Sequence, residues 1–290
     1  MRSDSSGASS CRPVPRIARR PRGSPTNVPR TLRLTLSYDG SEYHGWQVQA
    51  DARTVQGCLI DAAQKVVGDA IRVIGASRTD AGVHALGQVC SLVTTSTLSA
   101  SSVRTALNAL LPADIRVLSA TDVERPFDAR RSACGKRYGY VIDDGEIAMP
   151  LMLRYAWHVG APLDVGAMRA ALRRLRGRHD FSAFCAAPGR ARDPRCTLRA
   201  VHVVRKKRLV ALFLSADSFL HHMVRNIVGS AVEVGLGRRE PEWMARVLER
   251  RDRALAGPTV PAHGLVLLRV MYPRGSDDAA GAHLDLLERH

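Results

Sequence analysis

The chain of 290 residues has few cysteines, and none of them lie close together. The six cysteines form no Cys-x-x-Cys pair: Cys11, Cys58, Cys90, Cys134, Cys185 and Cys196. This spacing excludes a zinc ribbon and a disulfide scaffold, and it is typical of a reducing compartment, so we expect a cytoplasmic protein. No apolar run reaches the ~18–20 residues of a membrane-spanning helix, which excludes an integral membrane protein. The phosphate-loop pattern Gly-x4-Gly-Lys-Ser/Thr is also absent.

Lysine and acidic residues are scarce, whereas arginine is abundant. Lys and Arg together number 43 against 27 Asp and Glu, which gives a net charge of +16. Only four of the basic residues are lysines: Lys65, Lys136, Lys206 and Lys207. The preference for arginine over lysine is explained equally well by a GC-rich genome and by a function of arginine. A GC-rich genome does not explain the net positive charge. A chain this basic is expected to bind a polyanion, of which nucleic acid is the commonest.

The two ends of the chain are predicted to lie outside the fold. Residues 1–30 contain five of the 15 prolines, six serines, seven arginines and one acidic residue. Such a segment cannot bury enough apolar surface to offset the entropy of ordering it, so we expect a disordered basic tail. Residues 273–290 are expected to form a second tail. Between the tails we expect an N-terminal α/β subdomain at 31–130 and a C-terminal α/β subdomain at 131–272.

Hydrophobic periodicity predicts alternating strands and helices from residue 31 onward. The expected strands cover 32–38, 71–76, 88–94, 114–120, 136–142, 154–159, 198–205, 208–215 and 264–271. The expected helices cover 54–67, 101–111, 164–176 (capped by Asp164), 219–235 and 241–250. The first half has the order β-α-β-β-α-β, and the second half repeats it. We therefore predict an α+β fold of two ferredoxin-like (βαββαβ) subdomains related by pseudo-symmetry.

The loop at 75–85 contains the first candidate catalytic residue. It follows a predicted strand and is bracketed by glycines, and catalytic side chains are often presented on such loops. Asp80 in this loop is suited to act as a nucleophile or general base once an arginine holds it ionised. On residue type alone, an aspartate that caps a turn is the commoner interpretation, and both stay open at this point.

Two tyrosines lie on a predicted strand later in the chain. Tyr138 and Tyr140 share one face of this strand, because alternate side chains point the same way. The segment resembles the aromatic signature of RNA-recognition domains, but it departs from that signature at Arg137 and Asp143. A core tyrosine with solvated neighbours is an equally good interpretation.

The predicted helix at 219–235 contains the pair His221 and His222, followed by Arg225. Adjacent histidines on one helix cannot face the same metal ion, so we expect no metal site there. An arginine on a largely apolar helix needs an anionic partner, which makes Arg225 a candidate for an ion pair. Eight basic residues and one acid lie between Arg190 and Arg208, which predicts either a solvated strand face or a surface that follows phosphates.

Seven blocks of the sequence together resemble the bacterial tRNA pseudouridine synthases of the TruA type. They are LSYDGSEYHGWQ (36–47), RTDAGVHA (78–85), GQV (87–89), RYGYVI (137–142), HDFSAF (179–184), FLHHMVRNIVGSAVEVGLGR (219–238) and HGLVLLRV (263–270). Two positions depart from the usual family pattern. Ser77 stands where the family has glycine, and Gly139 replaces an arginine between the tyrosines, which is expected to remove one cation beside the site.

The resemblance implies an isomerase that converts uridine to pseudouridine at positions 38–40 of the tRNA anticodon stem-loop. It also implies the pseudouridine synthase fold, with the sheets of two subdomains flanking a central basic cleft. The implied partners are the tRNA anticodon arm and a second copy of the chain, in a homodimer. The reaction conserves the composition of the base, so no cofactor and no metal are expected.

The resemblance further implies roles for single residues. Asp80 carries over as the nucleophile, with attack on C1′ or on C6 left open. Tyr138 carries over as the ring that stacks on the flipped base and as a candidate acceptor of the C5 proton. Arg78 is expected to fill the space that the flipped base leaves, and Arg225 to pair with Asp80. Leu265 is expected to form the apolar wall behind the base.

Two other functions fit parts of the sequence. A pseudouridine synthase acting on another RNA would have the same basic surface. A non-catalytic RNA-binding protein built from RRM-like units would share the order of elements, because fold alone does not determine function. Such a protein has no use for Asp80, whose charge repels phosphate.

Overall fold

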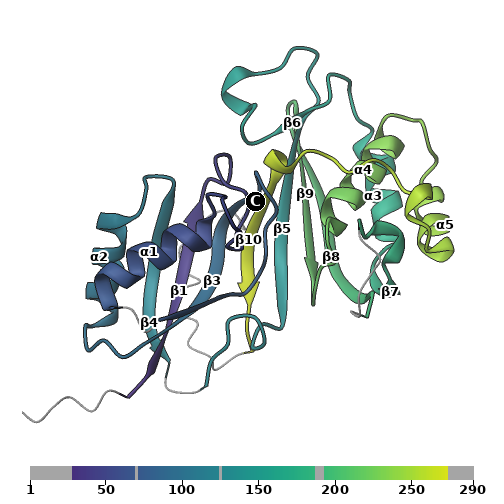
Figure 1. Cartoon of the computed structure of the whole chain (residues 1–290). Coiled ribbons are helices and arrows are strands. Elements are labelled where there is room, and N and C mark those ends of the chain that lie inside the picture. The colour runs from purple at the N-terminus through teal and green to yellow at the C-terminus, as the bar shows by residue number, and fades with distance from the viewer. Residues whose placement is uncertain (1–27, 69–70, 124–125, 187–192, 274–290) are drawn as a thin grey trace, which may run out of the picture.

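The computed structural model describes most of the chain (Figure 1), in the ranges 28–68, 71–123, 126–186 and 193–273. The tails expected at 1–30 and 273–290 fall almost entirely outside the described residues. Within those ranges, every helix is too short or too polar to cross a bilayer.

The first half of the chain forms the predicted β-α-β-β-α-β order. Its elements are β1 (Arg30–Tyr38), α1 (Val55–Val67), β2 (Arg72–Gly75), β3 (His84–Thr94), α2 (Ala100–Leu110) and β4 (Ile115–Val123). The predicted strand is confirmed at β1, where Leu32, Leu34 and Leu36 are fully buried, and the intervening Arg33 and Thr35 are buried as well. α1 begins after Thr54, whose hydroxyl accepts a hydrogen bond from the Gly57 amide. α1 and α2 pack together beside β2 and β4.

The second half contains six strands and three helices among the described residues. These are β5 (Gly135–Asp143), β6 (Trp157–His158), α3 (Val165–Arg173), β7 (Gly177–Asp180), β8 (Arg195–Lys206), β9 (Leu209–Ala216), α4 (Met223–Gly235), α5 (Trp243–Arg250) and β10 (Leu265–Met271). Short 3₁₀ turns lie at Pro150–Met152, Ser182–Phe184, Arg253–Leu255 and Ala262–Gly264. The predicted cap of α3 is confirmed, because Asp164 accepts a hydrogen bond from the Ala167 amide at 2.9 Å.

The helix predicted at 219–235 begins four residues later than expected. His222 has a left-handed backbone with φ of 58°, which ends the preceding turn and cannot belong to a helix. Phe219 extends the apolar four-residue spacing of Met223 and Ile227 backward, so periodicity alone does not reveal this boundary. Strand β7 was not predicted, and the strand expected at 154–159 is reduced to the two residues of β6.

The ten strands of the described ranges all join one sheet, whereas two sheets were expected. The strand order is β4-β1-β3-β10-β5-β9-β8-β7, with β2 paired to β3 and β6 paired to β5. The last strand, β10, joins the two halves, because it pairs parallel with β3 and antiparallel with β5. This arrangement brings the loop after β2 close to β5 and to the segment before α4. The pseudo-symmetry of the two halves stays a prediction.

Candidate active site

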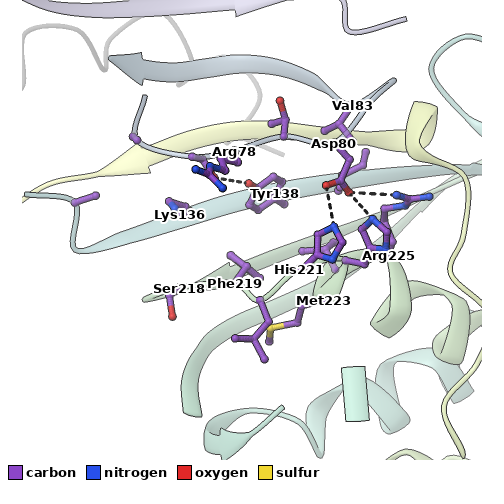
Figure 2. Close-up of a pocket in the computed structure, with 18 of the residues that line it drawn as sticks. Arg78, Asp80, Val83, Lys136, Tyr138, Ser218, Phe219, His221, Met223 and Arg225 are labelled. Carbon is purple, nitrogen blue, oxygen red and sulfur yellow. Dashed lines mark hydrogen bonds and ion pairs between the residues drawn. The ribbon is translucent and has the colours of Figure 1, made fainter. Parts of the chain in front are cut away.

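A cavity of about 620 Å³ lies where the loop after β2, strand β5 and the segment before α4 meet (Figure 2). All five site residues proposed from the sequence line it: Arg78, Asp80, Tyr138, Arg225 and Leu265. Arg130 and Lys136 also line it, and Asp217 is the second carboxylate. Cationic groups therefore outnumber carboxylates, which favours an anionic ligand.

The loop that carries Asp80 is held against the segment 40–46. The Trp46 amide donates a hydrogen bond to the Thr79 carbonyl oxygen at 3.0 Å. Gly45 has φ of +86°, and a β-carbon there would lie 2.5 Å from that same oxygen. Only glycine permits this approach, so the His-Gly-Trp part of the first sequence block supports the loop that carries Asp80.

A buried hydrogen-bond network lies beneath the loop. The Gln88 side chain donates to the Ser77 carbonyl at 2.7 Å and accepts from the Ser77 amide at 3.2 Å. The hydroxyls of Tyr38 and Thr79 lie 2.8 Å apart. All four residues are buried. Because unpaired buried polar groups are costly, this network fixes the backbone immediately before Asp80.

Arg225 lies next to Asp80, at the distance of an ion pair. Its Nη1 atom is 3.2 Å from Asp80 Oδ2, and its Nε atom donates to the Val260 carbonyl at 2.8 Å. The Arg225 side chain is 15% exposed and the Asp80 side chain 29% exposed. Water therefore screens the pair only in part, and removing either partner leaves the other charge poorly solvated.

Two histidines also face Asp80, and the sequence did not predict this. His222 Nε2 lies 3.3 Å from Oδ2, and His221 Nε2 lies 3.8 Å from Oδ1. Figure 2 shows His221 and Arg225 next to the Asp80 carboxylate. Burial lowers the pKa of His222, the charge of Asp80 opposes this, and neighbouring cationic groups lower it further. The assignment of both histidines to the helix was wrong. Both lie in the turn before α4, so both side chains can face one carboxylate.

Asp80, His221 and His222 place ligand atoms within 4.8 Å of one another, a spacing that fits a divalent metal ion. One reason for expecting no metal was that both histidines share a helix, and that reason does not hold. Electrostatics gives a different reason. Arg225 already occupies one oxygen of Asp80, and three other cationic side chains line the cavity. A dication would add charge to an already cationic site, so we assign no metal to this cluster.

Tyr138 lies on β5 at the cavity and is buried. Its hydroxyl is 2.9 Å from the Ser77 hydroxyl, and its ring packs edge-on against Phe219 with centroids 5.1 Å apart. Burial raises the pKa of Tyr138 to about 12, the hydrogen bond with Ser77 opposes this shift, and the charge of Asp80 adds to it. The phenol is therefore protonated at neutral pH.

The Ser77–Tyr138 contact predicts coupled effects on stability. Ser77→Ala is expected to lower the free energy of unfolding by about 1 kcal/mol, because a buried hydroxyl loses its partner. Urea denaturation of Ser77→Ala, Tyr138→Phe and the double variant measures the effect. We expect a coupling energy of about 0.5–1 kcal/mol between the two positions. Strictly additive losses would contradict the contact.

Position 139 faces away from the cavity. A β-carbon at Gly139 would lie 3.2 Å from Leu268 Cδ1, on the face of β5 opposite Tyr138. The expectation that Gly139 removes a cation beside the site was therefore wrong. Tyr140 shares the face of Tyr138 but is fully buried, and its hydroxyl donates to the Pro261 carbonyl at 2.8 Å. It is thus a core residue.

The remaining proposed residues differ in exposure. Arg78 is exposed, and its Nε atom donates to Gln47 Oε1 at 3.2 Å. Leu265 is buried at the start of β10 and lines the same cavity. His84, which belongs to the same block as Asp80, accepts a hydrogen bond from the Gly40 amide at 3.0 Å and lies outside the cavity lining. His84 therefore supports the loop.

Comparison with known proteins shows which family the chain resembles. A family model described as tRNA pseudouridine synthase matches residues 35–130 and 171–273. A Myxococcus xanthus protein named tRNA pseudouridine synthase A is 44% identical over 249 residues, which cover 86% of this chain and 94% of the relative. Relatives of the same name from Moorella thermoacetica and Chloroflexus aurantiacus are 44% and 42% identical. These alignments cover 83% and 85% of this chain, and 99% and 90% of the relatives.

Proposed function

This chain belongs to the tRNA pseudouridine synthase family, and we propose that it isomerises uridine to pseudouridine at positions 38–40 of the tRNA anticodon stem-loop, with Asp80 as the nucleophile. The chain is thus an isomerase. The observation that carries the proposal is the pair of Asp80 and Arg225 at the wall of a basic cavity. At about 620 Å³, this cavity falls in the usual size range of ligand sites.

The target uridine must first leave the RNA stack, at a cost of a few kcal/mol. We assign Arg78 to the space that the base leaves. Its side chain is exposed, it lines the cavity, and it lies two residues from Asp80. A planar guanidinium stacks on the neighbouring bases and contacts phosphate, which offsets part of the cost of extrusion.

Asp80 then attacks the uridine at C1′ or at C6. Either attack uses a carboxylate oxygen as the nucleophile, and Arg225, whose Nη1 lies 3.2 Å from Oδ2, helps to hold the carboxylate in position. The N1–C1′ bond breaks, the base turns, and the C5–C1′ bond forms. The bond from Asp80 to C1′ or C6 breaks in the course of these steps, which regenerates the free carboxylate. One proton leaves C5 and one is gained at N1. The composition of the base is unchanged, so the balance needs no oxidant, reductant or group donor.

We assign Tyr138 and Leu265 to binding the flipped base. Tyr138 presents an aromatic ring at the cavity, while its hydroxyl is held by Ser77. With a pKa raised to about 12, the phenol is poorly suited to accept the C5 proton, so we favour stacking as its role. Leu265 supplies apolar surface on the same cavity, which suits the face of a pyrimidine.

We also propose that the protein is a homodimer that binds the tRNA anticodon arm. The segment between β5 and β6, which extends from the top of the sheet in Figure 1, exposes several apolar side chains. Ile147 is 76% exposed, Leu151 89% and Leu153 50%. Apolar groups gathered on one segment commonly mark a protein contact, so this segment is our candidate for the dimer interface.

Two further proposals concern organisation and location. We propose that 31–130 and 131–272 are subdomains related by pseudo-symmetry, because strands and helices alternate on both sides of β10. We propose a cytoplasmic location, which is supported by the free cysteines of the described chain: Cys58, Cys90, Cys134, Cys185 and Cys196.

The decisive experiment is to incubate the purified chain with unmodified tRNA transcripts and to map pseudouridine at single-nucleotide resolution. We expect modification at positions 38–40 of transcripts that have uridine there, and no modification elsewhere. Pseudouridine at other positions of the transcripts, or only in other RNAs, would mean that positions 38–40 of tRNA are not the substrate. Binding of tRNA without any pseudouridine would instead support a non-catalytic RNA-binding protein.

A further inference from the structure

A second hollow on the surface, of about 610 Å³, lies beside the end of α3 and the strands β7 and β8. We call it the arginine groove, and it is lined by Arg173, Arg176, Gly177, Thr197, Leu198 and Arg199. Its three charged lining residues are all arginines, and all three are exposed. Figure 1 shows α3, β7 and β8 near the end of the sheet that lies opposite β4.

The three arginines retain free hydrogen-bond donors. Arg173 Nε donates to the Arg169 carbonyl at 3.3 Å, and Arg199 Nη2 donates to the Cys134 carbonyl at 3.0 Å. Each guanidinium has five N–H donors, so most stay available. Neighbouring arginines differ, because Arg174 is paired with Glu242 and Arg205 with Asp144. Within the described ranges, no carboxylate forms an ion pair with the three groove arginines, although the charge of Arg199 contributes to lowering the pKa of Asp217.

The arginine groove adjoins the catalytic cavity. The Cys134 carbonyl that Arg199 contacts follows Ala133, a residue of the cavity lining. On the same strand as Arg199, the Thr197 amide donates to Asp217 Oδ1 at 2.9 Å, and Asp217, which follows β9, also lines the cavity. Cationic groups therefore continue from the cavity, at Arg130 and Lys136, into the groove.

We propose that the arginine groove binds the phosphate backbone of the substrate RNA next to the nucleotide held in the catalytic cavity. The inference rests on the proposed function, because a target nucleotide in the cavity places the adjoining backbone beside the cavity. Arginine suits this role because its planar fork matches phosphate oxygens. Contacts of this kind fix the position of the RNA without reading its sequence.

The test compares two triple variants that lose the same charge. The groove variant is Arg173→Gln/Arg176→Gln/Arg199→Gln. The control variant is Arg72→Gln/Arg104→Gln/Arg250→Gln, whose positions are exposed and outside both cavities. Filter binding of an unmodified tRNA transcript between about 50 and 200 mM salt gives the Kd and its salt dependence, and steady-state kinetics gives kcat.

For the groove variant we expect the Kd to rise at least about tenfold at the lowest salt, with kcat unchanged. The magnitude of the slope of log K against log salt should decrease by about 2 to 3, since each of the three lost phosphate contacts contributes about 0.7–0.9. The control variant should change the Kd less than about threefold. Equal Kd values and slopes for the two variants would overturn the inference, because overall charge would then explain the binding.

Failure of the inference and failure of the proposed function give different results. A wild-type protein that makes no pseudouridine rejects the proposed function. If the wild-type protein is active and the groove variant binds tRNA as tightly as the wild type, only the inference about the groove is rejected. If circular dichroism shows that the triple variant is unfolded, Arg176→Gln serves instead, with an expected slope change of about 0.7–0.9. An unchanged slope in that variant also overturns the inference.

Discussion

Asp80→Asn is expected to lower pseudouridine formation by at least about 10⁴-fold while leaving the Kd for tRNA within about tenfold of the wild type. The amide keeps the shape and hydrogen-bonding capacity of the side chain but cannot act as a nucleophile. Binding should be nearly preserved, because the change adds no bulk and removes one negative charge from a cavity that receives RNA. Pseudouridine mapping and filter binding measure the two quantities on the same protein sample.

Asp80→Glu is the matched variant for geometry. It keeps the charge but moves the carboxylate by one methylene, away from the position in which Arg225 Nη1 lies 3.2 Å from Oδ2. We expect it to be far less active than the wild type and more active than Asp80→Asn. Appreciable turnover by Asp80→Asn would exclude Asp80 as the nucleophile, whatever the glutamate variant does.

Arg225→Met is expected to lower kcat about 100-fold, which corresponds to about 2.7 kcal/mol. Breaking a fully buried ion pair costs about 3–5 kcal/mol, and we expect less here because Asp80 is 29% exposed. The same change removes the donor to the Val260 carbonyl, so unfolding must be measured alongside kcat. Arg225→Lys keeps the charge but cannot contact both Asp80 and the Val260 carbonyl. Its kcat should therefore lie between those of the wild type and Arg225→Met.

Arg78→Met separates the role of Arg225 from that of Arg78. Arg78 is exposed at the cavity, and we assign it to base extrusion. A substrate whose target uridine is already unstacked should therefore restore much of the activity of Arg78→Met. It should not restore that of Arg225→Met, because the unstacked substrate leaves Asp80 without its partner. Rescue of the Arg225 variant alone would mean that the two roles are reversed.

Several features of the fold were predictable because they depend on local periodicity. The alternation that ends at Tyr38 identified β1, and the capping residue Asp164 marked the start of α3. Local patterns are silent about pairing between distant strands. The sequence therefore predicted two sheets, whereas β10 joins both halves into one.

The candidate site, like the fold, was predictable only where local sequence patterns carry the information. Arg225 was predicted to need an anionic partner because its helix is otherwise largely apolar, and Asp80 lies at ion-pair distance although it is 145 residues away. The two histidines were missed as partners of Asp80, because the left-handed backbone of His222 leaves no periodic signal in the sequence. Gly139 was misplaced because β5 turns that position away from the cavity.

The sequence by itself determined the basic charge, most strands and helices, and the blocks that resemble the family. These properties depend on composition or on neighbours within a few residues. Tertiary structure alone decided the hydrogen bond between Ser77 and Tyr138, the facing of His221 and His222 toward Asp80, and the junction of the arginine groove with the cavity. Each depends on strand register and on backbone angles in turns, since these set which distant side chains meet.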